Sequence, residues 1–300
     1  MNGIIVLDKP ADFTSFDAVA VMRGLSKERK IGHTGTLDPM ATGVLPLLLG
    51  RAAKAADLLP DTEKAYRAEF RLGERRDTGD VTGQIVEQND ASVSEEELRA
   101  ALERFQGEIW QTPPMYSAVS VGGKRLYELA RKGIEVERAP RKITIGRLEL
   151  ERYKESAREG VLQVSCSKGT YIRTLIEDIA KAMGTCGTMT ALRRVYACGF
   201  SEQDALPLIE LRRLASEEKL HTVLRPVESL FGEYPGVTVS PAQENRFCNG
   251  GSLSVERLRM PKIALTEGLR FSVYGTDKQF LGLAAMDMQK NELRFVKRFV

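Results

Sequence analysis

The amino-acid sequence predicts a mixed α+β fold that ends in a small β-rich module. Runs of strand length occur at 3–7, 66–72 and 161–167, and the second alternates at period two. A helical repeat with a period near 3.6 residues is clearest over 172–183. Prolines and glycines gather around residue 232, and short β-like runs follow them. These observations favour a body that mixes strands and helices, followed by a separate module.

A helix is predicted to begin after Thr14, shortly behind the first strand. The Thr14 hydroxyl can cap this helix, and Asp17 completes a variant of the capping box three residues later. Phe16, Val19 and Ala20 repeat on one face of the helix, so we expect that face to be buried.

The middle of the chain alternates between strands and a second helix. The run 45–49 is apolar enough to be buried, and 66–72 has the pattern of a half-buried strand. Residues 73–90 have the polar composition of a loop that leads to another strand. A capping box at Ser94 then starts a helix over 94–105. One side of this helix is lined by Leu98, Ala101, Leu102 and Phe105.

Beyond this helix, the strand 161–167 leads into the helix 172–183, and a further helix is expected over 206–220. A composition shift follows at Pro226, Gly232, Pro235, Gly236 and Pro241. We therefore expect two domains, 1–232 and 233–300. The second domain should contain β-like runs at 269–274, 280–286 and 293–300.

Composition and cysteine usage indicate a soluble protein of the cytoplasm. The 300 residues include four cysteines without a C-x-x-C pair and only two histidines, so no zinc-ligand spacing exists. Free thiols suit a reducing compartment. No apolar run approaches the ~20 residues needed to span a bilayer, and the N-terminal segment lacks the pattern of a signal peptide. No membrane partner is expected.

The net charge of +3 is too small to identify a nucleic-acid partner, so the local charge distribution has to decide. From residue 124 to residue 147, eight Lys or Arg stand against three Glu. One interpretation is phosphate contact by cations that include Lys124, Arg125, Arg131 and Lys132. The other is a solvated helix face with ion pairs such as Glu128–Lys132. The charge pattern leaves both interpretations open.

A single acid, Asp38, lies among glycines and small residues in the stretch 30–46. Gly32, Gly35 and Gly43 allow backbone shapes that other residues avoid, and they let a ligand approach the main chain. Asp followed by Pro is a strong signal for a helix N-cap, which is one interpretation of Asp38. The other interpretation is a carboxylate nucleophile.

Other chemical uses of a lone acid lack supporting residues. A retaining glycosidase needs a second carboxyl group about 5 Å away, and none is near in the sequence. An enzyme with a phosphorylated aspartate would also use Mg²⁺, yet Met40 stands where a second acid could help to bind it. The P-loop pattern is absent as well.

The run 35–45 closely resembles the signature of the pseudouridine synthases, specifically of the bacterial tRNA pseudouridine-55 synthases. Further stretches resemble this family in the family's own order: Lys9-Pro10 with Thr14-Ser15, the strand at Tyr66, 114–118, 123–127, 167–173 and 192–194. The resemblance covers roughly residues 3 to 200, and the tail is similar to the small RNA-binding module of bacterial members. Asp38 is therefore interpreted as the catalytic residue.

The resemblance implies the pseudouridine synthase fold, in which helices flank a central mixed sheet. It also implies a PUA-like module at 233–300 and an RNA-clasping insertion at about 115–147. The implied reaction is the isomerisation of uridine 55 in the T loop of tRNA, so that C5 replaces N1 in the bond to C1′. No atom is gained and no redox change occurs, so neither a metal nor another cofactor is expected. The implied partner is the T arm of tRNA, and we expect a monomer without protein partners.

In this interpretation Asp38 acts on a nucleotide that has been flipped out of the RNA. A carboxylate is ionised at pH 7 without a helper base, which suits this role. The acid could attack the base or the sugar carbon, stabilise an oxocarbenium-like sugar, or remove the 2′ proton to give a glycal. The sequence leaves these chemical paths open.

The family resemblance also implies roles for other residues of the site. Arg173 would be the cation beside Asp38, although its sequence context alone favours a surface pair with Glu177. Tyr66 would stack on the target base and assist proton removal from C5, although a strand Tyr more commonly faces a core. The implied substrate-binding residues are Tyr171 and Leu192 as walls of the base pocket, His33 as an RNA contact, and Lys9 as a buried partner.

Two alternatives compete with a site-specific RNA isomerase. A tRNA-binding or tRNA-folding chaperone, with modification as a secondary activity, is compatible with the basic segment. A metal-free glycosidase for small nucleosides is disfavoured by that segment and by the C-terminal module.

Overall fold

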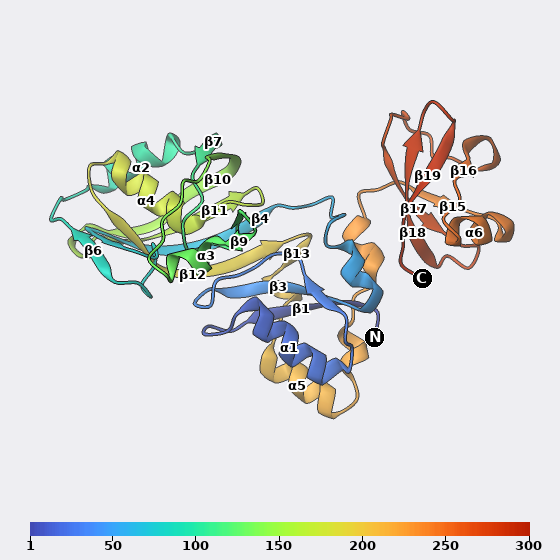
Figure 1. The fold of residues 1–300 in the computed structure, drawn as a ribbon, viewed down its shortest axis with the longest axis horizontal. Coiled ribbons are helices and arrows are strands. Elements are labelled where there is room, and N and C mark those ends of the chain that lie inside the picture. The colour runs from blue at the N-terminus through green and yellow to red at the C-terminus, as the bar shows by residue number, and fades with distance from the viewer.

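The computed structural model describes residues 1–300, and its larger part is built on one ten-stranded mixed sheet (Figure 1). The strands are β1 (Gly3–Lys9), β2 (Ile31–His33), β3 (Thr42–Leu49), β4 (Lys64–Leu72), β7 (Gly107–Gln111), β10 (Arg141–Lys154), β11 (Glu159–Cys166), β12 (Gly187–Ala197), β13 (Phe200–Ser201) and β14 (Leu206–Pro207). Their order is β14-β1-β3-β12-β4-β11-β10-β7, with β2 paired to β3 and β13 to β12.

Helices pack on this sheet and complete the main core. They are α1 (Ser15–Ser26), α2 (Glu95–Glu103), α4 (Ile172–Ala182) and α5 (Leu208–Ser216). Short 3₁₀ helices lie at Gly50–Ala55, Glu155–Ala157, Glu202–Asp204, Leu220–Val223 and Val227–Phe231. The predicted α+β class, with a mixed sheet flanked by helices, is confirmed.

Helix α1 begins as predicted but buries a different face. Thr14 is the N-cap and Asp17 completes the capping box. The buried residues, however, are Ser15, Ala18, Val19, Met22 and Ser26, whereas Phe16 is 68% exposed. Of the predicted face, Val19 is buried as expected, whereas the prediction is wrong for Phe16 and Ala20. The reason is tertiary, because the Ser15 hydroxyl has to face the backbone of Leu37.

A parallel contact between β3 and β12 joins the two halves of the sheet. Thr42 pairs with Arg193 and Gly43 with Arg194. Gly43 has a φ of +100°, and a Cβ there would lie 2.2 Å from the Arg194 carbonyl oxygen. No other residue fits this position. Gly32 and Gly35 have no positive φ, so the prediction of unusual backbone shapes holds at Gly43 alone within this stretch.

The second half of the sheet contains β4, whose predicted alternation is confirmed by its burial pattern. Helix α2 has the predicted capping box at Ser94 but ends at Glu103, two residues before Phe105. The polar region 73–90 is more ordered than predicted. It forms a hairpin of β5 (Glu74–Arg76) and β6 (Ile85–Gln88).

The helix predicted over 206–220 is shorter than expected. Pro207 is the N-cap of α5, and the two residues before the helix form β14 against β1. The helix ends at Ser216, and Glu218 has a φ of +58° that is incompatible with its continuation.

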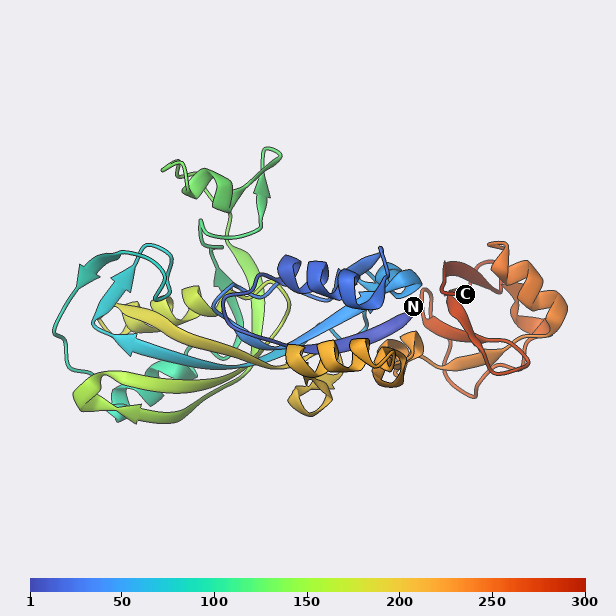
Figure 2. The same cartoon turned by 90° about the horizontal axis from the view of Figure 1, so that it is seen from below.

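The basic segment projects from the sheet as a separate arm (Figure 2). Between β7 and β10 the chain forms a small hairpin of β8 (Ser120–Val121) and β9 (Lys124–Arg125), and then α3 (Leu126–Ala130). Only Leu126 and Leu129 of α3 are buried. The arm therefore contributes little to the main core and leaves its polar side chains in solvent.

The last residues form a five-stranded sheet at one end of the elongated molecule (Figure 1). Its strands are β15 (Gly236–Thr238), β16 (Leu253–Ser254), β17 (Arg270–Tyr274), β18 (Phe280–Asp287) and β19 (Glu292–Arg298), with the helix α6 (Pro241–Cys248) and a 3₁₀ turn at Val255–Arg257. The three predicted strands of this module are confirmed as β17, β18 and β19.

The C-terminal sheet has a core of its own and also shares a second core with the body. Its own core includes Phe247, Phe271 and Leu281. The shared core brings Phe231 of the body within 6.0 Å of Phe280 and 5.7 Å of Phe299, measured between ring centroids. The division into two domains at residue 232 thus remains a prediction. The structure adds that apolar side chains pack across this boundary. No helix anywhere in the chain is both long and apolar enough to cross a lipid bilayer.

Candidate active site

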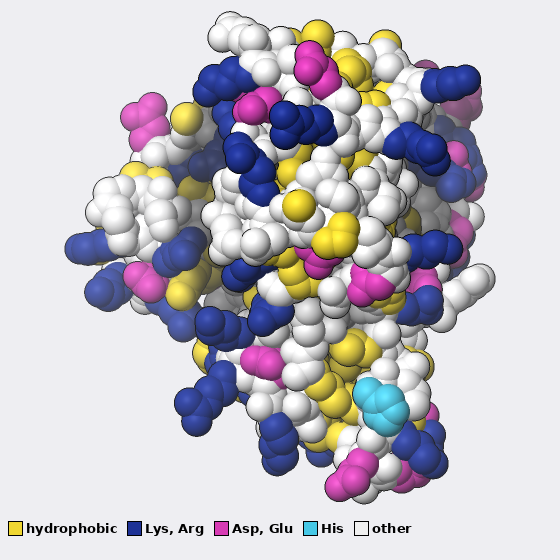
Figure 3. Space-filling view, turned by 90° about the vertical axis from the view of Figure 1, so that its right-hand side faces the viewer, with side chains coloured by type: hydrophobic (Ala, Val, Ile, Leu, Met, Phe, Trp, Pro, Cys, Tyr) yellow, Lys and Arg dark blue, Asp and Glu magenta, His cyan; other side chains and the backbone are white.

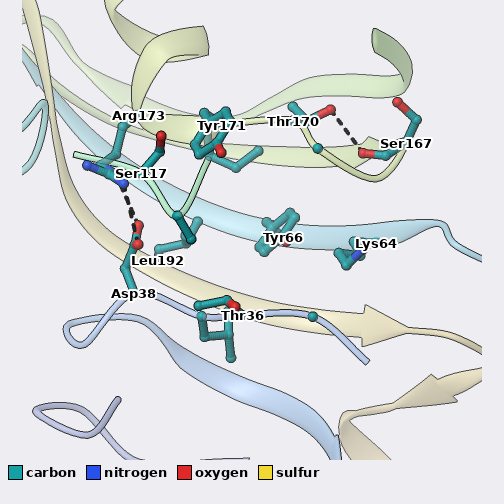
Figure 4. Close-up of a pocket in the computed structure, with 15 residues that line it drawn as sticks. Thr36, Asp38, Lys64, Tyr66, Ser117, Ser167, Thr170, Tyr171, Arg173 and Leu192 are labelled. Carbon is teal, nitrogen blue, oxygen red and sulfur yellow. Dashed lines mark hydrogen bonds and ion pairs between the residues drawn. The ribbon is translucent and has the colours of Figure 1, made fainter. Parts of the chain in front are cut away.

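A cavity of about 270 Å³ opens where the two halves of the sheet meet. Its floor is formed by Lys64 and Tyr66 of β4 and Leu192 of β12 (Figure 4). One wall is the loop 35–38 and another is 167–173, at the start of α4. Ser117 and Ala118, at the root of the basic arm, also line it. Asp38 is the only acid in the lining.

The loop that carries Asp38 is a turn and does not begin a helix. The Ala41 amide donates to the Asp38 carbonyl at 3.1 Å, and β3 follows at Thr42. Leu37 is buried, and its amide donates to the Ser15 hydroxyl at 2.9 Å. Because Leu37 faces the core, its neighbour Asp38 faces the cavity. The helix N-cap interpretation is therefore wrong.

Arg173 holds the Asp38 carboxylate across the cavity (Figure 4). Its Nε lies 3.0 Å from Asp38 Oδ2, and its Nη2 donates to Oδ1 at 3.4 Å. The remaining guanidinium donors are used as well: Nη1 bonds the Thr78 carbonyl at 2.8 Å and Nη2 the Tyr116 carbonyl at 2.9 Å. The side chain is 6% exposed, so the surface pair with Glu177 is not formed.

A second acid, Asp80, approaches the same guanidinium from the protein interior. Its Oδ2 lies 3.7 Å from Arg173 Nε, and the residue is 5% exposed. Its Oδ1 accepts hydrogen bonds from Thr78 Oγ1 at 2.9 Å and from the Thr82 amide at 3.0 Å. Asp80 was not predicted, because 73–90 has the composition of a polar loop. The repeated Asp-Thr-Gly and Asp-Val-Thr-Gly sequences in that loop were the available signal.

The electrostatic environment of Asp38 combines opposing effects. Burial among protein atoms raises the pKa of its carboxyl group above the ordinary value, although the side chain is 35% exposed toward the cavity. The Arg173 guanidinium opposes this increase, whereas the Asp80 carboxylate adds to it. Arg173 is shared between two acids, so it does not fully offset the desolvation of Asp38.

Tyr66 and Tyr171 give the cavity its aromatic character (Figure 4). Tyr66 is 7% exposed, and burial raises the pKa of its phenol to about 12 although the nearby Arg194 guanidinium opposes the rise. Tyr171 stands directly before α4, with its backbone bonded to Gln111. Leu192 completes an apolar surface beside both rings. Such a surface suits a planar base.

No group of three or more His, Cys, Asp or Glu side chains in the chain is arranged to hold a metal ion. The polar groups of the cavity are one acid, two cations and several hydroxyls. This set can bind a neutral or anionic organic ligand and place a carboxylate against it.

Comparisons with known proteins agree with the motif resemblance. The sequence profile of the TruB family pseudouridylate synthases, N-terminal domain, matches residues 23–172. The profile of the tRNA pseudouridylate synthase B C-terminal domain matches residues 173–232. The chain belongs to the TruB family of pseudouridylate synthases.

Relatives of this TruB-family synthase are similar over nearly the whole chain. A tRNA pseudouridine synthase B of Clostridium tetani (strain Massachusetts / E88) is 41% identical over 301 residues, which covers 100% of both chains. One of Burkholderia mallei (strain NCTC 10247) is 42% identical over 284 residues, or 95% of this chain and 93% of that protein. A chain in the crystal structure of a Cbf5–Nop10–Gar1 complex has a TM-score of 0.77 at 25% identity, covering 99% of this chain and 85% of its own.

The other residues predicted for the site of this TruB-family synthase lie outside the cavity lining. Lys9 is fully buried beneath the Asp38 loop, and its ammonium donates to the carbonyls of Pro10 at 2.8 Å, Phe13 at 2.5 Å and Pro39 at 3.1 Å. Burial lowers the pKa of Lys9 to about 8. Its three donors are used, so Lys9 supports the loop from below.

His33 lies at the end of β2 and does not line the cavity. Its Nδ1 is buried without a hydrogen-bond partner. Burial lowers the pKa of the imidazole, and the Arg194 guanidinium acts in the same direction. The structure gives no direct contact between this histidine and the acid–arginine pair.

The four cations predicted to contact RNA are exposed on the arm and make no ion pairs: Lys124, Arg125, Arg131 and Lys132. The pair Glu128–Lys132 is not formed, whereas the neighbouring Arg138 and Lys142 are paired with Glu135 and Glu108. Over the end of the molecule seen in Figure 3, Lys and Arg side chains are spread widely, with Asp and Glu between them. The lack of an ion pair is not special to the arm, because exposed cations near the C-terminus, such as Lys262, Lys290 and Arg298, form none either.

Proposed function

We propose that this TruB-family synthase converts uridine 55 in the T loop of tRNA to pseudouridine, with Asp38 as the nucleophile. The observation that carries the proposal is the placement of Asp38 as the one acid in a cavity lined by two cations, hydroxyls and apolar side chains, where Arg173 holds it at 3.0 Å. The full-length similarity to proteins named tRNA pseudouridine synthase B supports tRNA as the substrate.

The chain's residues can be assigned to the steps of the isomerisation. The N1–C1′ bond breaks while Asp38 attacks or stabilises the electron-poor carbon. The uracil then turns over between Tyr66, Tyr171 and Leu192, and C5 bonds to C1′. C5 loses a proton and N1 gains one, so the atoms balance without an added reagent. Arg173 orients the carboxylate through all these steps.

The target nucleotide has to leave the RNA stack before it can reach Asp38. The acid faces a cavity that is walled by 35–38 and 167–173, and a base stacked in a loop cannot enter it. Flipping costs on the order of a few kcal/mol. Contacts between RNA phosphates and the unpaired cations of the arm can offset this cost. Shape would dominate recognition, as is usual for structured RNA.

We further propose that the body, 1–232, carries the chemistry and that the module, 233–300, is a PUA-like domain that binds RNA. Its shared core with the body, through Phe231, Phe280 and Phe299, supports a fixed orientation between the two. A fixed module would present one continuous surface to the T arm.

The test is pseudouridine mapping in an unmodified tRNA transcript and in a T-arm stem-loop after incubation with the purified protein. Formation at position 55 is expected in both RNAs, and EDTA should not alter the rate. Asp38→Asn keeps the shape of the side chain, so it should abolish turnover while RNA binding persists. Turnover by Asp38→Asn, or modification at another position only, would contradict the proposal. Binding and refolding of tRNA by a protein without turnover would favour the chaperone instead.

A further inference from the structure

The cavity has a second cation, Lys64, at the end opposite the Asp38–Arg173 pair (Figure 4). Tyr66 lies between the two ends on the floor. Lys64 and Tyr66 are two residues apart on β4, so their side chains share one face of the strand at a spacing of roughly 7 Å. A ring placed on Tyr66 with its sugar at Asp38 therefore extends toward Lys64.

The Lys64 ammonium is short of partners. It makes no ion pair, and its one hydrogen bond goes to the Thr62 carbonyl at 3.4 Å. Arg173 by contrast has every donor nitrogen engaged. Burial lowers the pKa of Lys64 and the Arg194 guanidinium adds to this, whereas the nearby Cys198, Cys166 and Asp61 oppose it. A half-buried cation with two unused donors can take an acceptor from a ligand.

Neighbouring groups hold Lys64 in place and add a further donor. A Cβ on Gly35 would lie 3.0 Å from Lys64 Cε, so the bare glycine leaves room for the lysine stem. Ser167 Oγ accepts from the Thr144 amide at 2.9 Å, which leaves its own proton free to donate. The nearby acid Asp61 is bonded to the Tyr196 hydroxyl at 2.5 Å rather than to Lys64.

We propose that Lys64 binds an exocyclic oxygen of the target uracil and stabilises the negative charge that the ring gains when its bond to the sugar breaks. This inference rests on the proposed function and deepens it. When the N1–C1′ bond breaks, its electron pair stays on N1 and spreads to O2 and O4. When C5 bonds to C1′, the ring returns the pair, C5 loses its proton and N1 is protonated.

The assignment does not depend on which chemical path operates. Attack of Asp38 on the base instead of the sugar also moves an electron pair onto the uracil oxygens. In both cases an ammonium that is already placed in the cavity favours the charged state more than the ground state. Lys64 is thus a catalytic residue that acts on the base, whereas Asp38 acts on the carbon it attacks.

The experiment is single-turnover pseudouridine formation in a T-arm stem-loop at saturating protein. Lys64→Met keeps most of the stem and removes the charge, so the saturated rate should fall by about 100-fold. The Kd for RNA should change by no more than about threefold, because one neutral oxygen contributes little to binding of a polyanion. Lys64→Arg should retain more activity than Lys64→Met. The matched control is Lys181→Met, an exposed lysine in the last turn of α4, which should behave as wild type.

Chemical rescue separates this role from a structural one. Lys64→Ala opens space beside Gly35, so added ethylammonium should restore part of its saturated rate. Lys64→Met should not be rescued, because its side chain still fills the space. A Lys64→Ala protein that unfolds at the wild-type temperature but is not rescued would overturn the proposal.

A phosphate ligand is the competing outcome. In that case Lys64→Met would raise the Kd for RNA and keep the wild-type saturated rate. Replacing a phosphate next to the target nucleotide by a methylphosphonate would then weaken RNA binding by the wild type but not by the variant. That result overturns the base contact while the proposed function stands. A wild-type protein that forms no pseudouridine in the T arm would overturn the proposed function and this role together.

Discussion

Gln111 holds the backbone of Tyr171 at two points. Its Oε1 accepts from the Tyr171 amide at 2.8 Å, and its Nε2 donates to the Tyr171 carbonyl at 3.1 Å. Gln111 ends β7 and is 2% exposed. The side-chain amide thus joins the edge strand of the sheet to the loop 167–171 through two hydrogen bonds. It fixes a cavity wall two residues before Arg173.

Replacing Gln111 should therefore loosen the wall without touching the acid. Gln111→Leu has a similar volume but leaves the Tyr171 amide unpaired, at a cost of about 1–3 kcal/mol in the free energy of unfolding. The Tyr171 carbonyl keeps its hydrogen bond from the Leu175 amide at 3.0 Å. We expect the turnover rate to fall by about tenfold. Gln111→Glu, which accepts but cannot donate when ionised, should lie between the wild type and Gln111→Leu. Urea unfolding and single-turnover kinetics check these values, and an unchanged rate in Gln111→Leu would remove the positioning role.

A side chain that keeps only the positive charge of Arg173 should not support normal turnover. Lysine at this position keeps one positive charge but cannot reach Asp38 and the carbonyls of Thr78 and Tyr116 together. Arg173→Lys should lower the turnover rate by about 100-fold and leave RNA affinity within a few-fold. Arg99→Lys on α2, where the arginine forms an exposed pair with Glu95, is the matched control. A variant with near-normal turnover would show that Asp38 needs only a nearby cation.

The acidic limb of the pH–rate profile should report Asp38. Its pKa in the folded protein is raised by burial, so the carboxylate is lost as the pH falls through a value above the ordinary one. As the pH is lowered, activity should therefore decline at a pH above that at which a free aspartate is protonated. Asp80→Asn removes a neighbour that raises this pKa, so the limb should move to lower pH. Movement in the opposite direction would contradict the electrostatic role given to Asp80.

Tyr66 should act through its ring while its hydroxyl stays protonated. Burial raises the pKa of the phenol to about 12, so no phenolate is present near neutral pH. Tyr66→Phe keeps the surface for stacking and should retain more activity than Tyr66→Leu. Single-turnover rates of both variants check this order. Equal and complete loss in both would instead assign the chemistry to the hydroxyl.

The cations of the arm should contribute to RNA affinity rather than to chemistry. Changing Lys124, Arg125, Arg131 and Lys132 together to Gln should weaken T-arm binding and reduce the slope of log Kd against log salt by roughly 0.7–0.9 for each phosphate that is no longer neutralised. The saturated turnover rate should change little. A control that neutralises four exposed cations elsewhere would use Arg99, Arg152, Lys154 and Arg212. Equal effects of the two sets of substitutions would show that the arm is a solvated surface without specific RNA contacts.

The sequence by itself determined the family and most of the secondary structure, and it predicted Asp38 as the acid of the site. The capping boxes at Thr14 and Ser94 predicted two helix starts correctly, because a cap is a contact between residues three apart. The alternation in β4 predicted its buried side for a similar reason. Motif order along the chain identified Asp38, although local pattern alone favoured a helix cap there.

The family resemblance predicted Arg173 beside Asp38, whereas only the tertiary structure decided the other contacts around this pair. Arg173 is 135 residues away in sequence. Asp80 comes from a loop whose only signal was a repeated Asp-Thr-Gly pattern, and Gln111 comes from a segment without a local signal of a site. Phe16 and Ala20 of α1 were mispredicted as buried for the same reason, because the helix packs with Ser15 against the backbone of Leu37. Periodicity and capping reflect interactions within one or two turns of chain, whereas ion pairs and cavity walls arise when distant segments fold against each other. Their partners have to be seen in three dimensions.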